Sequence, residues 1–130
     1  ESIWGELEVG AERIGHGFRA VEDPVLVSHL AARGIPLEVC LSSNVATGVV
    51  ASFREHPARR LHDAGVPLVL NTDDPSFFHT TLAAELSLAE TELGFGVEDL
   101  KTLVRNGFDF AFDREAAWNS VQGGLRDVAG

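Results

Sequence analysis

Apolar and polar positions along this chain alternate in blocks that predict short strands followed by helices. Three short apolar segments bounded by turn-forming residues are expected to be strands: residues 13–17, 36–41 and 67–71. Apolar residues at helical spacing predict helices over residues 2–9, 24–33, 56–64, 81–93, 97–106 and 108–121. Residues 45–55 are assigned to a loop with one turn of helix.

The clearest helix signals lie between Asp23 and Gly34. Asp23 is an N-cap residue followed by Pro24 at the first helical position, and Gly34 suits the left-handed residue that ends a helix. Strands that alternate with helices imply an α/β fold with a parallel sheet covered by helices. Three short strands are compatible with a small doubly wound domain and with a slice of a larger fold, and both interpretations stay open.

Two adjacent acids, Asp73 and Asp74, follow the third predicted strand and precede Pro75. In α/β proteins the chemistry lies at the carboxyl ends of parallel strands. Like charges repel, so a buried pair needs compensation, by a metal ion for one acid and a substrate donor for the other. A solvated turn opened by Asp74 and Pro75 explains the pair as well.

His16 lies between two glycines at the end of the first predicted strand. Flanking glycines leave little packing around the ring, which argues against a core histidine, and they can mark a close approach of the backbone to a bound group. The functional and the structural interpretations of His16 stay equally open at this point. His29, His56 and His62 are expected to be solvated or to cap helices. Residues 42–44, Ser-Ser-Asn, are expected to form a polar turn after the second strand.

Composition narrows the class of protein. The chain has 130 residues, of which 45% are hydrophobic and 23% charged, as in ordinary globular domains. A net charge of −10 argues against nucleic acid or an anionic membrane as partner. The only cysteine, Cys40, has apolar neighbours and is expected to be a buried thiol in a reducing compartment, so we expect a cytoplasmic location. Because the chain starts at Glu1 and contains no methionine, we expect a piece of a longer protein.

Four segments occur in the order and spacing of a known family. They are residues 13–17 (Arg-Ile-Gly-His-Gly), residues 37–44 (Leu-Glu-Val-Cys-Leu-Ser-Ser-Asn), His56-Pro57 and residues 70–75 (Leu-Asn-Thr-Asp-Asp-Pro), and Thr80-Thr81-Leu82 followed by Glu85 supports them. Together they resemble the adenosine deaminase family over essentially the whole chain. The resemblance implies a (β/α)8 barrel that hydrolyses the exocyclic amine of a purine at a single zinc ion. The predicted strands are then barrel strands six, seven and eight, and residues 1–130 are the C-terminal half of the barrel.

The resemblance also implies roles for three side chains. Asp73 is the carboxylate ligand of the zinc ion, and zinc lowers the pKa of a bound water toward neutrality, which supplies hydroxide. His16 orients this hydroxide and assists its attack on the purine carbon that bears the amine. Asp74 makes a hydrogen bond at the imidazole ring of the purine. The two acids then avoid mutual repulsion, because one faces a cation and the other a ligand.

Two motifs of the family are missing from this sequence, a His-x-His and a His-Ala-Gly-Glu. The resemblance assigns to them three zinc-binding histidines and the glutamate that donates a proton to the purine, all upstream of Glu1. A barrel needs about 250 residues and zinc about four ligands. The chain alone is therefore expected to be inactive and to need the missing N-terminal half or a second copy as partner. A non-catalytic half-barrel, whether an assembly or binding module or a fragment without function, is the alternative.

Two positions depart from the family pattern. Leu41 stands where proline is usual, and Leu86 stands where tyrosine is common. Neither residue touches the chemistry implied above. They leave the substrate open between adenosine, adenine and an aminated purine nucleoside of the futalosine type.

Overall fold

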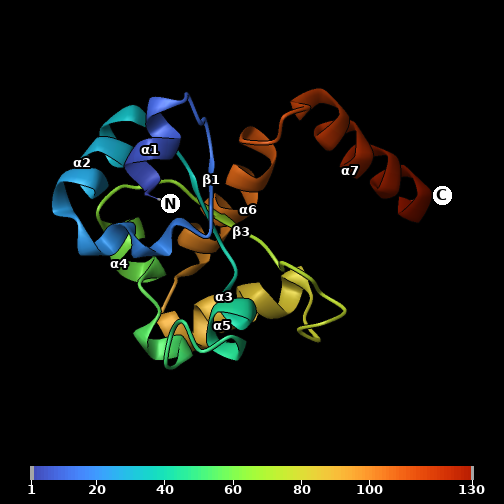
Figure 1. The fold of residues 1–130 in the computed structure, drawn as a ribbon. Coiled ribbons are helices and arrows are strands. Elements are labelled where there is room, and N and C mark those ends of the chain that lie inside the picture. Colours follow the sequence, from blue (N-terminus) through green and yellow to red (C-terminus); the bar gives the residue numbers. More distant parts are fainter. Residues whose placement is uncertain (1, 130) are drawn as a thin grey trace.

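Strands and helices alternate along the chain in the computed structural model, which describes residues 2–129 and their side chains as far as residue 122 (Figure 1). The elements are α1 (Ile3–Glu8), β1 (Ile14–Gly15), η1 (Gly17–Glu22), α2 (Pro24–Arg33), β2 (Leu37–Val39), α3 (Leu41–Ala46), η2 (Phe53–Glu55), α4 (Ala58–Asp63), β3 (Leu68–Leu70), α5 (Leu82–Leu93), α6 (Val97–Asp109) and α7 (Arg114–Ala129), with η1 and η2 as 3₁₀ helices. No helix among these residues is both long and apolar enough to cross a membrane.

The three strands form one parallel sheet in the order β1-β2-β3. Leu37 of β2 pairs with Ile14 on one side and with Leu68 on the other, so these three side chains share a face of the sheet. The predicted α/β class with parallel strands is confirmed. Because the strands are parallel, their carboxyl ends all lie at the same edge of the sheet. The segments that follow β1, β2 and β3 therefore lie near one another.

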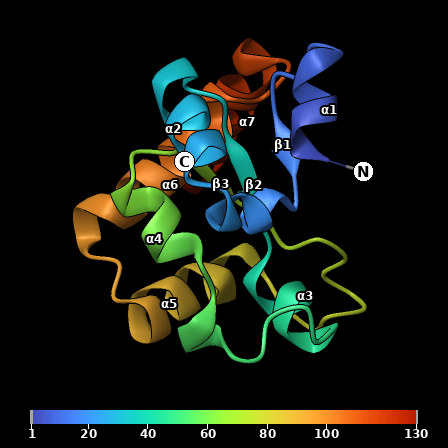
Figure 2. The ribbon, with the colours of Figure 1, turned by 60° about the vertical axis from the view of Figure 1, so that its left-hand side comes forward.

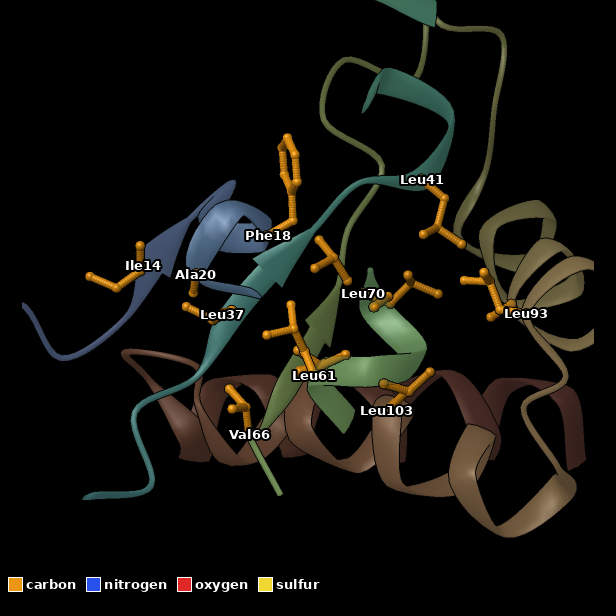
Figure 3. Close-up of a cluster of buried hydrophobic side chains, with 14 of the residues drawn as sticks. Ile14, Phe18, Ala20, Leu37, Leu41, Leu61, Val66, Leu70, Leu93 and Leu103 are labelled. Carbon is orange, nitrogen blue, oxygen red and sulfur yellow. The ribbon is translucent and has the colours of Figure 1, made fainter. Parts of the chain in front are cut away.

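Apolar side chains from the sheet and from the surrounding helices form one core (Figure 3). Ile14 and Leu37 come from the strands, and Leu61 of α4 and Leu103 of α6 meet them with at most 3% of their surface exposed. The helices α4, α5 and α6 pack against β3, and η1 packs against β2. The last helix, α7, contacts α6 and extends away from the sheet (Figure 1), and Figure 2 shows it beside α6 in a second view.

The predicted helix caps are confirmed where the sequence signals are strongest. The Asp23 carboxylate accepts hydrogen bonds from the backbone N–H groups of Val25 and Leu26 at the start of α2. Gly34 ends that helix with φ of 63°, in the left-handed region. A further N-cap, which was not predicted, starts α5, where the Thr81 hydroxyl accepts from Ala84 N at 3.1 Å.

The predicted polar turn at residues 42–44 is wrong, because this segment belongs to the helix α3. Contacts with distant residues satisfy the polar groups of residues 42–44, which would otherwise favour a turn. The Ser42 amide donates to the Glu85 carboxylate at 3.2 Å, and Asn44 Oδ1 lies 3.0 Å from His56 Nε2. The second strand therefore ends at Val39 instead of Leu41. Near the end of the chain α6 extends to Asp109 and α7 starts at Arg114, later than predicted.

Gly17 packs directly on the sheet. A Cβ atom at this residue would lie 2.6 Å from Leu37 Cδ2 and 3.0 Å from Ile14 Cγ2, and Leu37 is fully buried, so it has no free space to move into. The close approach that the glycine pattern suggested is thus to the protein core. We expect Gly17→Ala to lower the free energy of unfolding by about 1–3 kcal/mol.

Gly15→Ala is the matched control for this prediction, because a Cβ atom there meets nothing within 4 Å. Denaturant unfolding of both variants beside the unmodified protein measures the difference. Equal midpoints for Gly17→Ala and Gly15→Ala would show that Leu37 yields without cost.

Candidate functional site

The segments that follow the three strands bring two of the predicted site residues together. His16 comes directly after β1, and Asp73 comes three residues after the end of β3. His16 Nε2 lies 3.7 Å from Asp73 Oδ2. This separation is too long for a hydrogen bond. Because β2 lies between β1 and β3, the two side chains meet across the carboxyl end of β2. Ligands of parallel sheets bind at the carboxyl ends of the strands.

A buried hydroxyl orients the Asp73 carboxylate. Ser43 Oγ, on α3, donates a hydrogen bond to Asp73 Oδ2 at 2.6 Å, and Ser43 is only 3% exposed. The side chains of Asp73 and His16 are themselves 35% and 51% exposed, so they remain open to solvent above this hydroxyl. The contact between Ser43 and Asp73 could not be predicted from local sequence, because a turn was expected where α3 lies.

The backbone at both residues is strained. His16 has φ of 53° and Asp73 has φ of 58°, and outside glycine the described backbone reaches this left-handed region at only one further residue, His79. A residue with a Cβ atom adopts this region at an energetic cost, and such strain concentrates at functional sites. His16 and Asp73 are also the residues for which a chemical role was predicted. Their backbone strain therefore supports a functional site at the carboxyl edge of the sheet.

Asp74 builds a turn. Its Oδ1 accepts a hydrogen bond from Phe77 N at 2.9 Å, and its carbonyl oxygen accepts from Phe78 N at 3.0 Å. The turn interpretation of the dipeptide therefore holds for this residue, whose side chain is exposed. Its role in binding a substrate stays a prediction.

Cys40 directly follows β2 and is a buried thiol, as predicted. Burial raises the pKa of Cys40 to about 12, and the negative charges of Asp73, Glu85 and Glu38 add to this effect. The thiol is therefore protonated near neutral pH. Since the thiolate is the reactive form, Cys40 is unsuited to act as a nucleophile.

The remaining helical histidines lie outside the site. His56 is 3% exposed, and its Nδ1 accepts from Ala58 N at 3.1 Å, so the predicted capping role is confirmed. Burial lowers the pKa of His56 to about 4, which keeps the ring neutral. His29 and His62 are half-buried rather than fully solvated: His62 Nε2 lies 3.1 Å from Asp99 Oδ1, and the His29 ring packs on Trp4.

The described side chains fit a metal ion only in part. Among them, no group of three or more histidine, cysteine, aspartate or glutamate side chains could hold a metal. Zinc takes about four ligands from oxygen, nitrogen and sulfur. Asp73 offers an oriented, partly exposed carboxylate for one of them, with the His16 imidazole beside it. The other ligands would have to come from residues outside the described part of this chain.

A parallel sheet with a carboxylate and an imidazole meeting at its carboxyl edge is typical of α/β enzymes. The family model described as Adenosine deaminase matches residues 1–126, and the chain belongs to the adenosine deaminase family.

Three curated relatives that are similar to this chain carry three different names. The adenine deaminase of Rhizobium rhizogenes (strain K84) is 48% identical over 104 residues, which are 80% of this chain and 32% of the relative. The aminodeoxyfutalosine deaminase of Streptomyces coelicolor is 44% identical over 86% of this chain and 29% of its own length. The adenosine deaminase of Aliivibrio fischeri (strain MJ11) is 43% identical over 98% of this chain and 38% of its own length.

Solved structures share the fold of this chain. The crystal structure of adenine deaminase from Arthrobacter aurescens superimposes with a TM-score of 0.84 at 30% identity, over 98% of this chain and 39% of that one. An amidohydrolase from Burkholderia ambifaria with bound Zn gives a TM-score of 0.74 at 27% identity, over 95% of this chain and 36% of that one. The chain thus spans about a third of the length of the relatives and structures that it matches.

Proposed function

We propose that this chain is the C-terminal part of a zinc-dependent deaminase of a purine that carries an exocyclic amine. In this proposal β1, β2 and β3 are strands six, seven and eight of a (β/α)8 barrel. The observation that carries it is the 3.7 Å approach of His16 Nε2 to Asp73 Oδ2 at the carboxyl edge of the sheet. The family model, which covers both residues, and the relatives named adenine, adenosine and aminodeoxyfutalosine deaminase support it.

Asp73 would hold the zinc ion through one carboxylate oxygen, and histidines from the rest of the barrel would complete the ligand set. Zinc supplies Lewis acidity, which lowers the pKa of a water molecule toward neutrality and makes hydroxide available at physiological pH. The Ser43 hydroxyl would fix the direction of the Asp73 carboxylate, because it already donates to Oδ2.

His16 would act on the attacking water. Its Nε2 can accept a hydrogen bond from the water and direct the oxygen lone pair at the purine carbon that bears the amine. Nε2 takes one proton from the water as the carbon–oxygen bond forms and passes it to the amine, so that the carbon–nitrogen bond breaks and ammonia leaves, while the second proton of the water stays on the purine product. Asp74 would hold the purine by a hydrogen bond to its imidazole ring, so that the reacting carbon stays in line with the water.

The rest of the barrel would be the partner of this chain. The outer edge of β3 has no neighbouring strand among the described residues. A cavity of about 470 Å³ lies over one face of the sheet, where Arg13, Glu38 of β2 and Val69 of β3 face side chains of α5, α6 and α7, and its lining includes neither His16 nor Asp73. Unpaired strand edges bind further strands. The N-terminal barrel strands, or failing them a second copy of this chain, would cover this edge.

Completion of the barrel tests the proposed function. Residues 1–130 are fused behind the N-terminal remainder of the Rhizobium rhizogenes adenine deaminase, and ammonia release is measured with adenine, adenosine and aminodeoxyfutalosine. We expect the fusion to retain zinc and to release ammonia from at least one of these substrates, and we expect neither part alone to do so.

The same fusion distinguishes the alternative function. A folded fusion that retains zinc and releases no ammonia from any of the three substrates would contradict the enzymatic proposal. It would favour a half-barrel that serves only as a binding or assembly module, a possibility to which the unpaired edge of β3 also points.

A further inference from the structure

Glu85 is a carboxylate in the interior of the molecule. It lies in the first turn of α5 and is 0% exposed, on the helix face that also buries Ala89 and Leu93. A buried carboxylate is rare unless it is paired. Glu85 forms no ion pair with any basic side chain that the structure describes. Two hydrogen bonds hold it instead: Thr80 Oγ1 donates to Oε1 at 2.8 Å, and Ser42 N donates to Oε2 at 3.2 Å.

The two donors belong to the two segments that carry the Asp73 contact. Ser42 lies in the first turn of α3, where backbone N–H groups have no partner within the helix, and it directly precedes Ser43. Thr80 ends the segment that leaves β3 and carries Asp73. Glu85 therefore joins α3 to the far end of the Asp73 segment, while the bond from Ser43 Oγ to Asp73 Oδ2 joins the same two segments at the site.

We infer that Glu85 is a positioning residue for Asp73. Its carboxylate holds α3 and residues 71–80 at the separation at which Ser43 donates to Asp73, and so fixes the direction of the carboxylate that faces the metal. Glu85 acts through Ser43 and touches neither metal nor substrate. The inference rests on the proposed function for the metal-binding role of Asp73, but the geometry that it describes does not need the metal.

Both hydrogen bonds to Glu85 end on its carboxylate oxygens. A carboxylate accepts from both the Thr80 hydroxyl and the Ser42 amide, whereas glutamine has one acceptor oxygen and an NH₂ group. Glutamine can keep both contacts only if its oxygen accepts from Ser42 N and the Thr80 hydroxyl turns to accept from its NH₂ group, and both bonds then lose the charge of the carboxylate. In Glu85→Gln α3 is therefore expected to be held less firmly and to shift away from α5. The consequence is a longer distance between Ser43 Oγ and Asp73 Oδ2 and a less well oriented carboxylate.

The test uses the completed barrel with Glu85→Gln, Ser43→Ala and the double variant. Zinc affinity is measured by competition with a chelator. We expect Ser43→Ala to bind zinc about 10–100-fold more weakly, the range found when an outer partner of a metal ligand is removed, and Glu85→Gln to weaken zinc binding by a smaller factor. The double variant is expected to lose no more zinc affinity than Ser43→Ala alone, because Glu85 acts on Asp73 only through Ser43. Glu90→Gln, an exposed glutamate on the same helix, is the matched control and should bind zinc normally.

A second readout does not depend on the metal. In a crystal structure of zinc-free Glu85→Gln we expect the Ser43–Asp73 hydrogen bond to be broken. Thr80→Val removes only one donor and should change zinc affinity in the same direction by less, which keeps the test informative if Glu85→Gln folds poorly. An intact Ser43–Asp73 bond in Glu85→Gln, or independent losses in the double variant, would overturn the inference. Absence of zinc from the unmodified barrel would instead overturn the proposed function, and the zinc-free structure would still decide the role of Glu85.

Discussion

Asp73→Ala is expected to strip zinc from the completed barrel and to abolish deamination. Asp73 is the only acid in the described chain that is both oriented by a buried hydroxyl and directed to the strand edge beside His16. Loss of an outer partner of a metal ligand already costs about 10–100-fold in affinity, so loss of the ligand itself should cost more than about 100-fold. Zinc content after dialysis and ammonia release measure the two effects.

Asp74→Asn is the matched variant for this prediction, because it removes the neighbouring charge and leaves an oxygen that still accepts from Phe77 N. We expect it to retain zinc and to raise KM for the purine. If Asp73→Ala kept its zinc with near-normal turnover while Asp74→Asn lost the metal, the roles of the two acids would be interchanged.

His16→Asn is expected to lower kcat by about 10²–10⁴-fold while zinc content stays unchanged, which is the usual loss when a group that transfers a proton is removed. Asparagine tolerates the left-handed backbone at this position, where φ is 53°, so the variant removes the imidazole without adding backbone strain. Stopped-time ammonia assays at saturating purine give kcat, and metal analysis of the same samples gives zinc content.

His79→Asn controls for the substitution itself, because His79 is exposed and also has a left-handed backbone, with φ of 50°. Its kcat should stay close to that of the unmodified barrel. If kcat of His16→Asn were also close to that of the unmodified barrel, the imidazole beside Asp73 would take no part in the reaction.

Local signals account for the part of the fold that the sequence predicted correctly. Asp23 and Gly34 define the ends of α2 without help from distant residues, and the apolar segment before Asn71 forms β3. The position of Asp73 follows from the same logic, because a residue just after a strand must lie at the carboxyl edge of a parallel sheet.

Long-range contacts account for what the sequence did not reveal. Ser43 and Asp73 are 30 residues apart, and Ser42 and Glu85 are 43 apart, so neither contact leaves a mark in local periodicity. Residues 42–44 look like a turn because serine and asparagine bind nearby backbone, and contacts with Glu85, Asp73 and His56 make a helix favourable there. One signal was present for Glu85, which is spaced by four and eight residues from Ala89 and Leu93 on the buried face of α5.

Anomalous diffraction at the zinc edge from crystals of the completed barrel tests the central proposal most directly. We predict one zinc ion with an Asp73 carboxylate oxygen about 2.0–2.2 Å away and with the His16 imidazole facing the open side of the metal. A zinc ion bound in the barrel with no Asp73 oxygen among its ligands would contradict the assignment of this strand edge as the metal-binding part of the site.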